Sequence, residues 1–159
     1  MSALRVRNAT DADTEFLFEL FSENSQTNPA AWGLGEDQRS SLTMLQFKEE
    51  QESYRQNFPG AALMIVEWGS HRVGRLIVHE ADHEIHLVDI LVVGSWRGHG
   101  IGTDILSFFK HRAQSQDKPL RLRVAHQNPA RRLYERHGFS VTRDDGAYFT
   151  MEWWSPAGF

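Results

Sequence analysis

The chain has 159 residues, with 17 Lys or Arg against 21 Asp or Glu, so its formal net charge at pH 7 is −4. We expect one domain spanning residues 1–159, because a chain of this length can bury a core without disulfides or structural metals. A mildly acidic chain with dispersed basic residues is a poor partner for nucleic acid or an anionic membrane. The chain has no cysteine, no apolar leader in residues 1–5 and no membrane-length apolar run, so we expect a soluble, cytoplasmic protein.

In chain order, the hydrophobic pattern predicts a strand, two helices, three strands, and then helices alternating with strands. The predicted strands cover residues 4–7, 61–68, 72–80, 85–93, 120–125, 139–143 and 147–154. The predicted helices begin near Thr10, Asp37, Ile101 and Asn128, where capping or turn residues precede apolar residues at helical spacing. This order predicts an α/β fold, layered as in α+β proteins, with helices packed on a mixed sheet.

The strongest chemical signal is the segment Arg97-Gly98-His99-Gly100-Ile101-Gly102, which follows an apolar strand and starts a helix. Alternate glycines allow positive φ and leave no Cβ between backbone N–H groups and a ligand. The first N–H groups of a helix lack internal partners and lie at its positive end, so the segment predicts a phosphate site. A tight strand-to-helix turn would need the same glycines. The spacing matches neither a P-loop nor G-x-G-x-x-G, which disfavours nucleoside triphosphate and dinucleotide sites.

Two motifs in this order make the sequence resemble the GNAT superfamily of acyl-CoA-dependent N-acetyltransferases. The first is the strand Leu87–Val93 with the glycine segment, and the second is Asn128-Pro129-Ala130, Leu133-Tyr134-Glu135 and Gly138-Phe139. The sequence departs from the family at Gly94, where many members carry proline. The resemblance implies the GNAT fold, a twisted, mostly antiparallel sheet of about six or seven strands flanked by about four helices. It also implies acetyl-CoA as cosubstrate and no metal.

The resemblance implies roles for individual residues. Backbone groups of Leu91, Val92 and Val93 would bind the pantetheine arm in a gap beside strand 120–125. The Asn128 side chain would also contact the cofactor. Backbone N–H groups of the glycine segment would hold the pyrophosphate, the residues being Arg97, Gly98, His99, Gly100, Ile101, Gly102 and Thr103. The Tyr134 hydroxyl would lie near the thioester sulfur.

Acyl transfer to an amine needs a neutral nitrogen and benefits from an acid that protonates the departing thiolate. Tyr134 is the candidate acid, although without its motif a tyrosine packed in the core would be the simpler interpretation. Asp89 interrupts an apolar strand on the same face as Leu91 and is the candidate base. The alternative is a buried carboxylate paired with Arg75, Arg123 or a backbone N–H. Candidates for the acceptor pocket are Trp32, Tyr54, His86, His126 and Phe149, with the two histidines as fallback bases.

We therefore predict an N-acetyltransferase that moves an acetyl group from acetyl-CoA directly to a primary amine on a small molecule or peptide. A homodimer through Trp153 and Trp154 is a further possibility, and a non-catalytic acyl-CoA-binding module is the alternative function. The segment His79-Glu80-Ala81-Asp82-His83 matches H-E-x-x-H of zinc proteases. It lies between two strand-like runs with no room for a helix, so we favour a solvated hairpin turn. A surface metal site formed by His79, His83 and His86 stays open.

Overall fold

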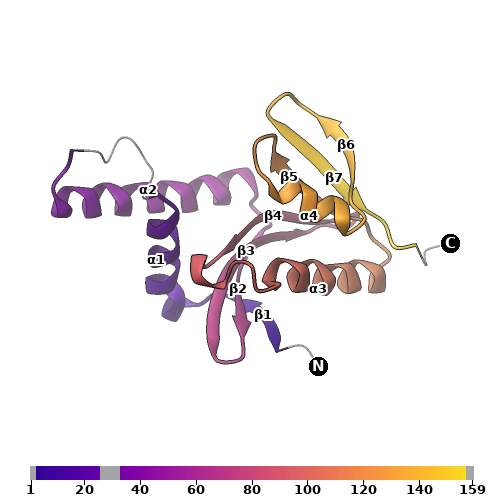
Figure 1. Cartoon of the computed structure of the whole chain (residues 1–159), viewed down its shortest axis with the longest axis horizontal. Coiled ribbons are helices and arrows are strands. Elements are labelled where there is room, and N and C mark those ends of the chain that lie inside the picture. The colour runs from indigo at the N-terminus through magenta and orange to yellow at the C-terminus, as the bar shows by residue number, and fades with distance from the viewer. Residues whose placement is uncertain (1–2, 26–32, 157–159) are drawn as a thin grey trace.

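The computed structural model describes residues 3–25 and 33–156. Within these residues, seven strands form one sheet in the order β1-β2-β3-β4-β5-β7-β6 (Figure 1). The strands are β1 (Leu4–Asn8), β2 (Ala62–Trp68), β3 (His71–Glu80), β4 (Ile85–Val92), β5 (Leu120–Ala125), β6 (Ser140–Asp144) and β7 (Tyr148–Trp153). The α-helices are α1 (Thr14–Ser25), α2 (Glu36–Asn57), α3 (Ile101–Ser115) and α4 (Ala130–Arg136).

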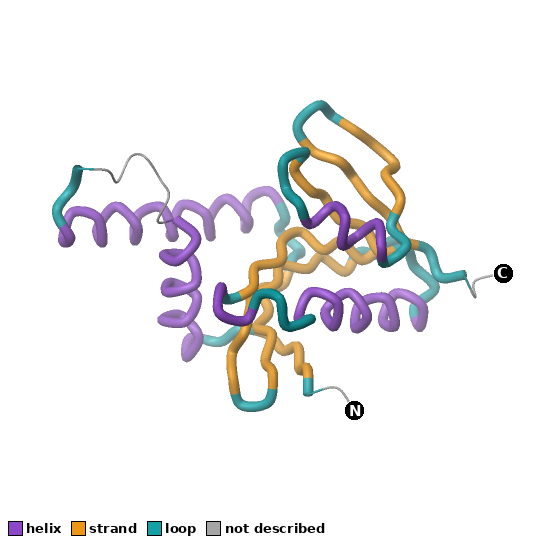
Figure 2. Tube along the Cα trace, viewed as in Figure 1, coloured by secondary structure: helices purple, strands orange, loops and turns teal. Residues whose placement is uncertain are grey.

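Every neighbouring pair of strands is antiparallel except β4 and β5, which are parallel. Parallel neighbours need a crossover connection, and α3 provides it between these two strands (Figure 2). The predicted fold class, a mixed and mostly antiparallel sheet flanked by four helices, is confirmed by this arrangement. None of the helices in the described part of the chain is long and apolar enough to cross a bilayer.

The larger core lies between the sheet and α3. Ile101, Ile105, Leu106 and Phe109 are buried on one face of this helix, at the spacing of an amphipathic helix. They pack with the buried residues that β3, β4, β5 and β7 direct to the same side of the sheet. Helix α4 lies beside α3, and a Cβ at Gly102 would come within 3.2 Å of a Leu133 methyl group. Glycine therefore allows the close approach of the two helices.

Helices α1 and α2 cover the opposite face of the sheet around a second, smaller cluster. Leu17 of α1, Phe47 of α2 and Ile65 of β2 are its buried residues. The Phe47 ring lies 5.6 Å from the ring of Phe18 and 5.5 Å from the ring of Phe21. These aromatic contacts lock the two helices together, so that α1 and α2 form one wall above β3 and β4.

Of the two adjacent tryptophans near the C-terminal end of β7, only one is largely exposed. Trp153 packs against the main core, and the Lys110 ammonium lies 5.3 Å from its ring centroid. Trp154 is 62% exposed. Any apolar surface that this pair presents therefore comes mainly from Trp154.

Candidate active site

Strands β4 and β5 separate after only three paired residues. Their ladder joins Ile85 to Leu120, His86 to Arg121 and Leu87 to Leu122, and ends there. Beyond this point β4 remains paired with β3 on its other side, and β5 remains paired with β7. The facing edges of β4 and β5 therefore form a gap whose walls carry backbone hydrogen-bonding groups, at the location that the resemblance implies.

A β-bulge at Val88 of β4 sets the direction of the strand at this gap. On β3, Ile77 pairs with Asp89 and Val78 pairs with Leu87, which leaves Val88 without a partner in the ladder. A bulge bends its strand and increases the local twist. The bend begins where β4 and β5 part, so it contributes to the separation of the two strands.

Backbone groups of alternate residues in β4 point into the gap. The Val93 N–H donates to the Val73 carbonyl at 2.8 Å, so the backbone groups of Val93 point toward β3 and away from the gap. In an antiparallel ladder the hydrogen-bonded pairs alternate, and Leu91 therefore also faces β3. The N–H and C=O groups of Ile90 and Val92 face the gap instead. We expected backbone groups of Leu91, Val92 and Val93 to bind the pantetheine arm. In the structure the residues whose backbone groups face the gap are Ile90 and Val92, so only Val92 is common to the expectation and the structure.

The glycine-rich loop leaves a run of backbone N–H groups without hydrogen-bond partners at the start of α3, among the described residues. Gly98 and Gly100 have φ of +79° and +82°, which favour glycine, and a Cβ at either would meet no atom within 4 Å. The first α-helical hydrogen bond runs from the Asp104 N–H to the Gly100 carbonyl, at 3.0 Å. Within the described chain, no hydrogen bond uses the backbone N–H groups of residues 98–103. Such a set of donors at a helix N-terminus fits a pyrophosphate.

Arg97 holds the loop in place. We expected its backbone N–H to be one of the pyrophosphate donors, but this N–H already has a partner. Its N–H donates to the Gly94 carbonyl at 3.2 Å, so the run of open donors begins one residue later. Its Nε donates to the Val92 carbonyl at 3.1 Å, and its Nη2 donates to Asn24 Oδ1 at 2.9 Å. A ring nitrogen of His99 lies 3.1 Å from the Arg97 carbonyl oxygen. Both side chains therefore contact the loop or α1 and shape the cradle.

Asn128 lies at the start of α4, on the β5 side of the gap. Its Oδ1 accepts the Ala130 N–H at 2.9 Å, and its own N–H donates to the Ala125 carbonyl at 3.0 Å. These bonds hold the carboxamide at the end of β5. Among the described residues its NH₂ group makes no hydrogen bond, which leaves two donors for a ligand.

Tyr134 lies on α4 and is partly buried against the main core. Its ring centroid lies 6.0 Å from that of Phe139. Burial raises the pKa of Tyr134 to about 12, and the nearby negative charge of Asp89 adds to the shift. The phenol is therefore protonated at neutral pH and can donate a proton. This electrostatic interaction also means that the two expected catalytic side chains lie in one region.

Asp89 belongs to a polar network that links the sheet to α2. The Tyr54 hydroxyl donates to Asp89 Oδ2 at 3.0 Å, and Arg75 forms an ion pair with the same oxygen. Arg75 is only 7% exposed, and its Nη1 also bonds Glu50 at 2.9 Å. Burial and then the Asp89 charge raise the pKa of Tyr54, so this hydroxyl stays a donor. Asp89 is therefore paired with Arg75, which was one of the partners that we considered for it as an alternative to a role as base.

His86 lies on the α2 side of the sheet, next to Phe58. The two ring centroids are 5.8 Å apart in an edge-to-face arrangement. Burial, followed by the positive charge of Arg121, lowers the pKa of His86 to about 4. Its Nε2 is buried without a hydrogen-bond partner among the described residues. The imidazole is therefore neutral at pH 7.

His126 and Phe149 lie together at the end of β5 nearest α4, apart from the α2 side of the sheet. Their rings stack with centroids 4.0 Å apart, and the Arg131 guanidinium lies 4.2 Å from the Phe149 centroid. His126 Nε2 lies 2.7 Å from Asp144 Oδ1. Phe149 packs on the main core, on the side of α3 and α4, whereas His86 lies on the other side. Trp32, also expected in the acceptor pocket, lies outside the described residues.

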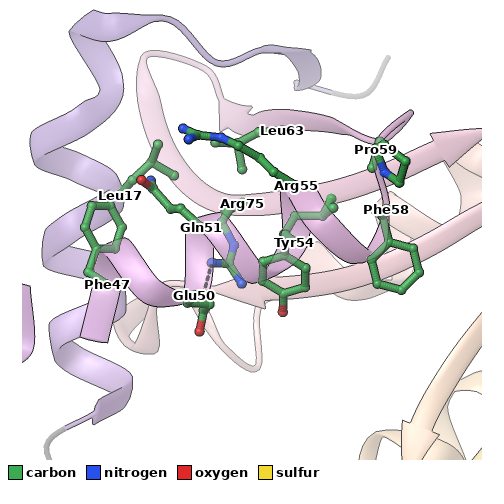
Figure 3. Close-up of a pocket in the computed structure, with 12 residues that line it drawn as sticks. Leu17, Phe47, Glu50, Gln51, Tyr54, Arg55, Phe58, Pro59, Leu63 and Arg75 are labelled. Carbon is green, nitrogen blue, oxygen red and sulfur yellow. Dashed lines mark hydrogen bonds and ion pairs between the residues drawn. The ribbon is translucent and has the colours of Figure 1, made fainter. Parts of the chain in front are cut away.

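A cavity of about 370 Å³ lies between α2 and the strands β2 and β3 (Figure 3). Phe47, Phe58 and Leu63 contribute to its apolar wall. Glu50 and Arg75 are among its polar lining residues, and Figure 3 shows the bond between them. Tyr54 also lines this space while its hydroxyl bonds Asp89, so the polar network joins one wall of the cavity to β4.

The H-E-x-x-H segment lies on a hairpin, as we predicted, and not on a helix. Strand β3 ends at Glu80, and the Ala81 N–H donates to the Glu84 carbonyl at 2.9 Å within the turn. The Glu80 carboxylate is bound by Arg112 of α3. In the part of the chain that the structure describes, no three His, Cys, Asp or Glu side chains are grouped to hold a metal ion.

Several residues of this region were missed by reasoning from the sequence. Glu50 and Glu23 gave no signal, because an acidic residue on a predicted helix is normally solvated. The Glu23 carboxylate accepts the Gly94 N–H at 2.6 Å although the two residues are 71 positions apart. Arg75 did carry a signal, since an arginine within an apolar strand needs a partner, and Asp89 is that partner.

Comparison with known proteins places this geometry in a family. Residues 36–151 match the model of the acetyltransferase (GNAT) domain. The PaiA N-acetyltransferase of Thermoplasma acidophilum, solved in complex with coenzyme A, has a similar fold with a TM-score of 0.68, 21% identity, and coverage of 98% of this chain and 100% of that one. An acetyltransferase of Thermus thermophilus gives a TM-score of 0.68 at 18% identity, with coverage of 98% and 100%.

A GNAT family acetyltransferase of Elizabethkingia anophelis, solved with acetyl-CoA bound, gives a TM-score of 0.64 at 12% identity, again with coverage of 98% and 100%. The sequence comparison with curated proteins gave no significant match. The family model covers well over half of the chain and includes β4, the glycine-rich loop and α4. The chain therefore belongs to the GNAT acetyltransferase family and is an acyltransferase.

Proposed function

We propose that this enzyme transfers an acetyl group from acetyl-CoA to a primary amine by direct attack, without a covalent enzyme intermediate. The observation that carries the proposal is the combination of the β4–β5 gap with the open N–H groups of residues 98–103. A ligand with a pyrophosphate joined to an extended amide-containing arm matches both parts, since the loop suits the phosphates and the strand edge suits the amides. Coenzyme A has this composition.

The cofactor supplies an activated thioester, and this chain's groups hold it and control the protons. Backbone N–H groups of Gly98 to Thr103 would bind the pyrophosphate, and the N–H of Val92, whose own carbonyl accepts Arg97 Nε, would bind a pantetheine amide. The Ile90 N–H, which lies farther from the glycine-rich loop than Val92 and next to Asp89 in the chain, is our candidate donor to the thioester carbonyl oxygen, where negative charge develops during attack. The Asn128 NH₂ group lies at the opposite wall of the gap and would contact the arm.

Tyr134 is our candidate acid for the departing sulfur. Its pKa of about 12 keeps the proton on the phenol at neutral pH, so the hydroxyl is available to donate it to the sulfur as the C–S bond breaks and negative charge develops there. The proton is then regained from solvent. This role requires only that the hydroxyl reach the end of the gap, and the effect of the Asp89 charge on the pKa of Tyr134 supports such a location.

The amine acceptor would approach from the α2 side, where Asp89, Tyr54 and Glu50 lie. The two carboxylates face a single guanidinium, that of Arg75, so the group carries a net negative charge that favours an ammonium ion. Asp89 Oδ2 is occupied by Arg75 and Tyr54, so we assign the proton acceptor role to Asp89 Oδ1, through a water molecule. In this assignment the base is Asp89, and α2 helps to orient its carboxylate through the hydrogen bond from Tyr54.

The proposal is tested by two measurements on the purified protein. Isothermal titration with coenzyme A measures binding directly, and a thiol-release assay with acetyl-CoA and a broad panel of primary amines measures transfer. Binding together with amine-dependent thiol release supports the proposal. Binding without release by any amine, peptide or lysine-containing protein in the panel supports the non-catalytic acyl-CoA-binding alternative. Failure to bind coenzyme A rejects both.

A further inference from the structure

The C-terminal end of α1 contacts the loop that follows β4. The Glu23 carboxylate accepts the Gly94 N–H at 2.6 Å, and the Asn24 carboxamide oxygen accepts Arg97 Nη2 at 2.9 Å. The Arg97 guanidinium in turn donates through Nε to the Val92 carbonyl at 3.1 Å. Adjacent side chains of one helix thus hold both the start of the loop and the end of β4.

Gly94 is suited to this contact in two respects. Its N–H donates to the Glu23 carboxylate at 2.6 Å. It also lacks a Cβ, and a Cβ at this position would collide with the Glu23 carboxylate and with nothing else within 4 Å. The N–H of Gly94 and the space left by its missing Cβ therefore both serve the contact with Glu23.

Asn24 is oriented for its contact by its own helix. Its Nδ2 donates to the Leu20 carbonyl at 2.8 Å, which directs the carboxamide oxygen away from that carbonyl and toward Arg97. Helix α1 is itself fixed to α2 through the ring contacts of Phe18 and Phe21 with Phe47. The loop is therefore attached to a supported element rather than to a free helix end.

We propose that Glu23 and Asn24 are positioning residues that hold the glycine-rich loop ready for the pyrophosphate before the cofactor arrives. A loop that is already ordered loses less conformational entropy when it binds, so these contacts raise affinity for the cofactor without touching the reacting atoms. The inference rests on the proposed function in one respect, namely that this loop binds coenzyme A. It predicts an effect on cofactor affinity and none on the chemical step.

The experiment is a double-mutant cycle at Glu23 and Gly94, read by calorimetric titration with coenzyme A. Glu23→Ala removes the acceptor and is expected to weaken binding about fivefold, the size of one lost hydrogen bond at an exposed site. Glu23→Gln keeps an acceptor oxygen and should bind within about twofold of wild type. Glu19→Ala, one turn earlier on the same helix and exposed, is the matched control and should bind as wild type.

Gly94→Ala provides the second arm of the cycle. It should weaken binding in the wild-type background, because its Cβ displaces the Glu23 carboxylate. It should have no further effect in the Glu23→Ala background, where the new methyl group meets no other atom. Asn24→Ala should weaken binding to a similar degree as Glu23→Ala. In the transfer assay, Glu23→Ala should raise KM for acetyl-CoA about fivefold and leave kcat within about twofold.

The outcomes separate this inference from the proposed function. If wild-type protein does not bind coenzyme A, the proposed function fails. If wild type binds and Glu23→Ala binds equally well or more tightly, the carboxylate does not position the loop and the inference is wrong. Additive effects of Glu23→Ala and Gly94→Ala would also overturn it. Melting temperatures of all variants distinguish a specific loss of affinity from general destabilisation, which would lower kcat as well.

Discussion

At Tyr134, burial and then the negative charge of Asp89 raise the pKa of the phenol to about 12. We expect Tyr134→Phe to lower kcat by about 10- to 100-fold, because the thiolate then leaves without a proton donor, while affinity for coenzyme A stays unchanged. Steady-state kinetics and calorimetric titration measure the two quantities. The high pKa also means that ionisation of Tyr134 should cause no loss of kcat below about pH 10. Unchanged turnover in Tyr134→Phe would remove this residue from the mechanism.

His86 provides a prediction about pH. Its pKa of about 4 in the folded protein lies below the ordinary value of 6.5, so the unfolded chain binds a proton first as pH falls. The folded state therefore loses stability between about pH 6.5 and pH 4. We expect His86→Gln to reduce this loss by about 1–2 kcal/mol, a figure lowered for partial solvent screening.

Urea unfolding at pH 7 and pH 4.5 measures the effect at His86. The exposed His83 of the neighbouring turn is the control, and His83→Gln should follow the wild-type dependence. Parallel curves for wild type and His86→Gln would show that the imidazole is not held neutral by its surroundings.

Contacts between distant residues were the part of the site that local sequence could not supply. The pairing of Asp89 with Arg75 was one of three alternatives, because a carboxylate in an apolar strand needs a partner but does not identify it. The Glu23–Gly94 bond gave no signal at all, since it depends on how α1 crosses the sheet. Residue types indicated where partners were needed, and the fold decided which ones they are.

Helix α3 starts from a residue in the left-handed conformation, Gly100. Gly100 precedes α3 with φ of +82°, whereas Gly35 precedes α2 with φ of −68°, and a Cβ at either would meet no atom within 4 Å. Both glycines are N-caps, so replacing either with alanine should destabilise its helix start by a similar amount. Only Gly100→Ala also forces a residue with a Cβ into the left-handed conformation, which costs about 1–2 kcal/mol. We expect Gly100→Ala to lower the free energy of unfolding by that additional amount and to weaken binding of coenzyme A.

Chemical denaturation of the Gly100→Ala and Gly35→Ala variants measures this difference between two equivalent helix starts. Equal losses of stability would mean that the φ of Gly100 relaxes at no cost. Coenzyme A titrations of the same two proteins then show whether the loop conformation matters for binding, because Gly35 lies far from the loop along the chain and on another helix.

The elements themselves were largely predictable, because alternation and helical spacing are local properties. The strand predicted over residues 120–125 is β5, and the helix predicted from Asn128-Pro129 is α4, whose first residue, Ala130, donates its N–H to the Asn128 side chain. The bulge at Val88 was not predictable, because it depends on the register between β3 and β4. The expectation that Leu91 and Val93 bind the pantetheine arm came from the resemblance, whereas the register with β3 directs the backbone groups of these two residues toward β3.

For the whole molecule, binding of the cofactor should appear as added stability. A ligand that binds only the folded state, at a free concentration 100-fold above its Kd, raises the free energy of unfolding by about 2.7 kcal/mol. For a chain of this size we expect the melting temperature to rise by roughly 5–10 °C. Thermal unfolding with and without acetyl-CoA measures the shift, with pantetheine, which lacks the pyrophosphate, as the weaker control. No shift at saturating acetyl-CoA would contradict the assignment of the gap.

The reliance on main-chain donors at β4 and at residues 98–103 has a consequence for how the enzyme can diversify. Peptide groups are the same for nearly every amino acid, so most substitutions leave this half of the site chemically intact, provided that the glycines remain. The side chains of α2 that surround the neighbouring cavity have no such restriction. Laboratory evolution toward new amines should therefore accumulate changes on α2 and few on the cofactor side.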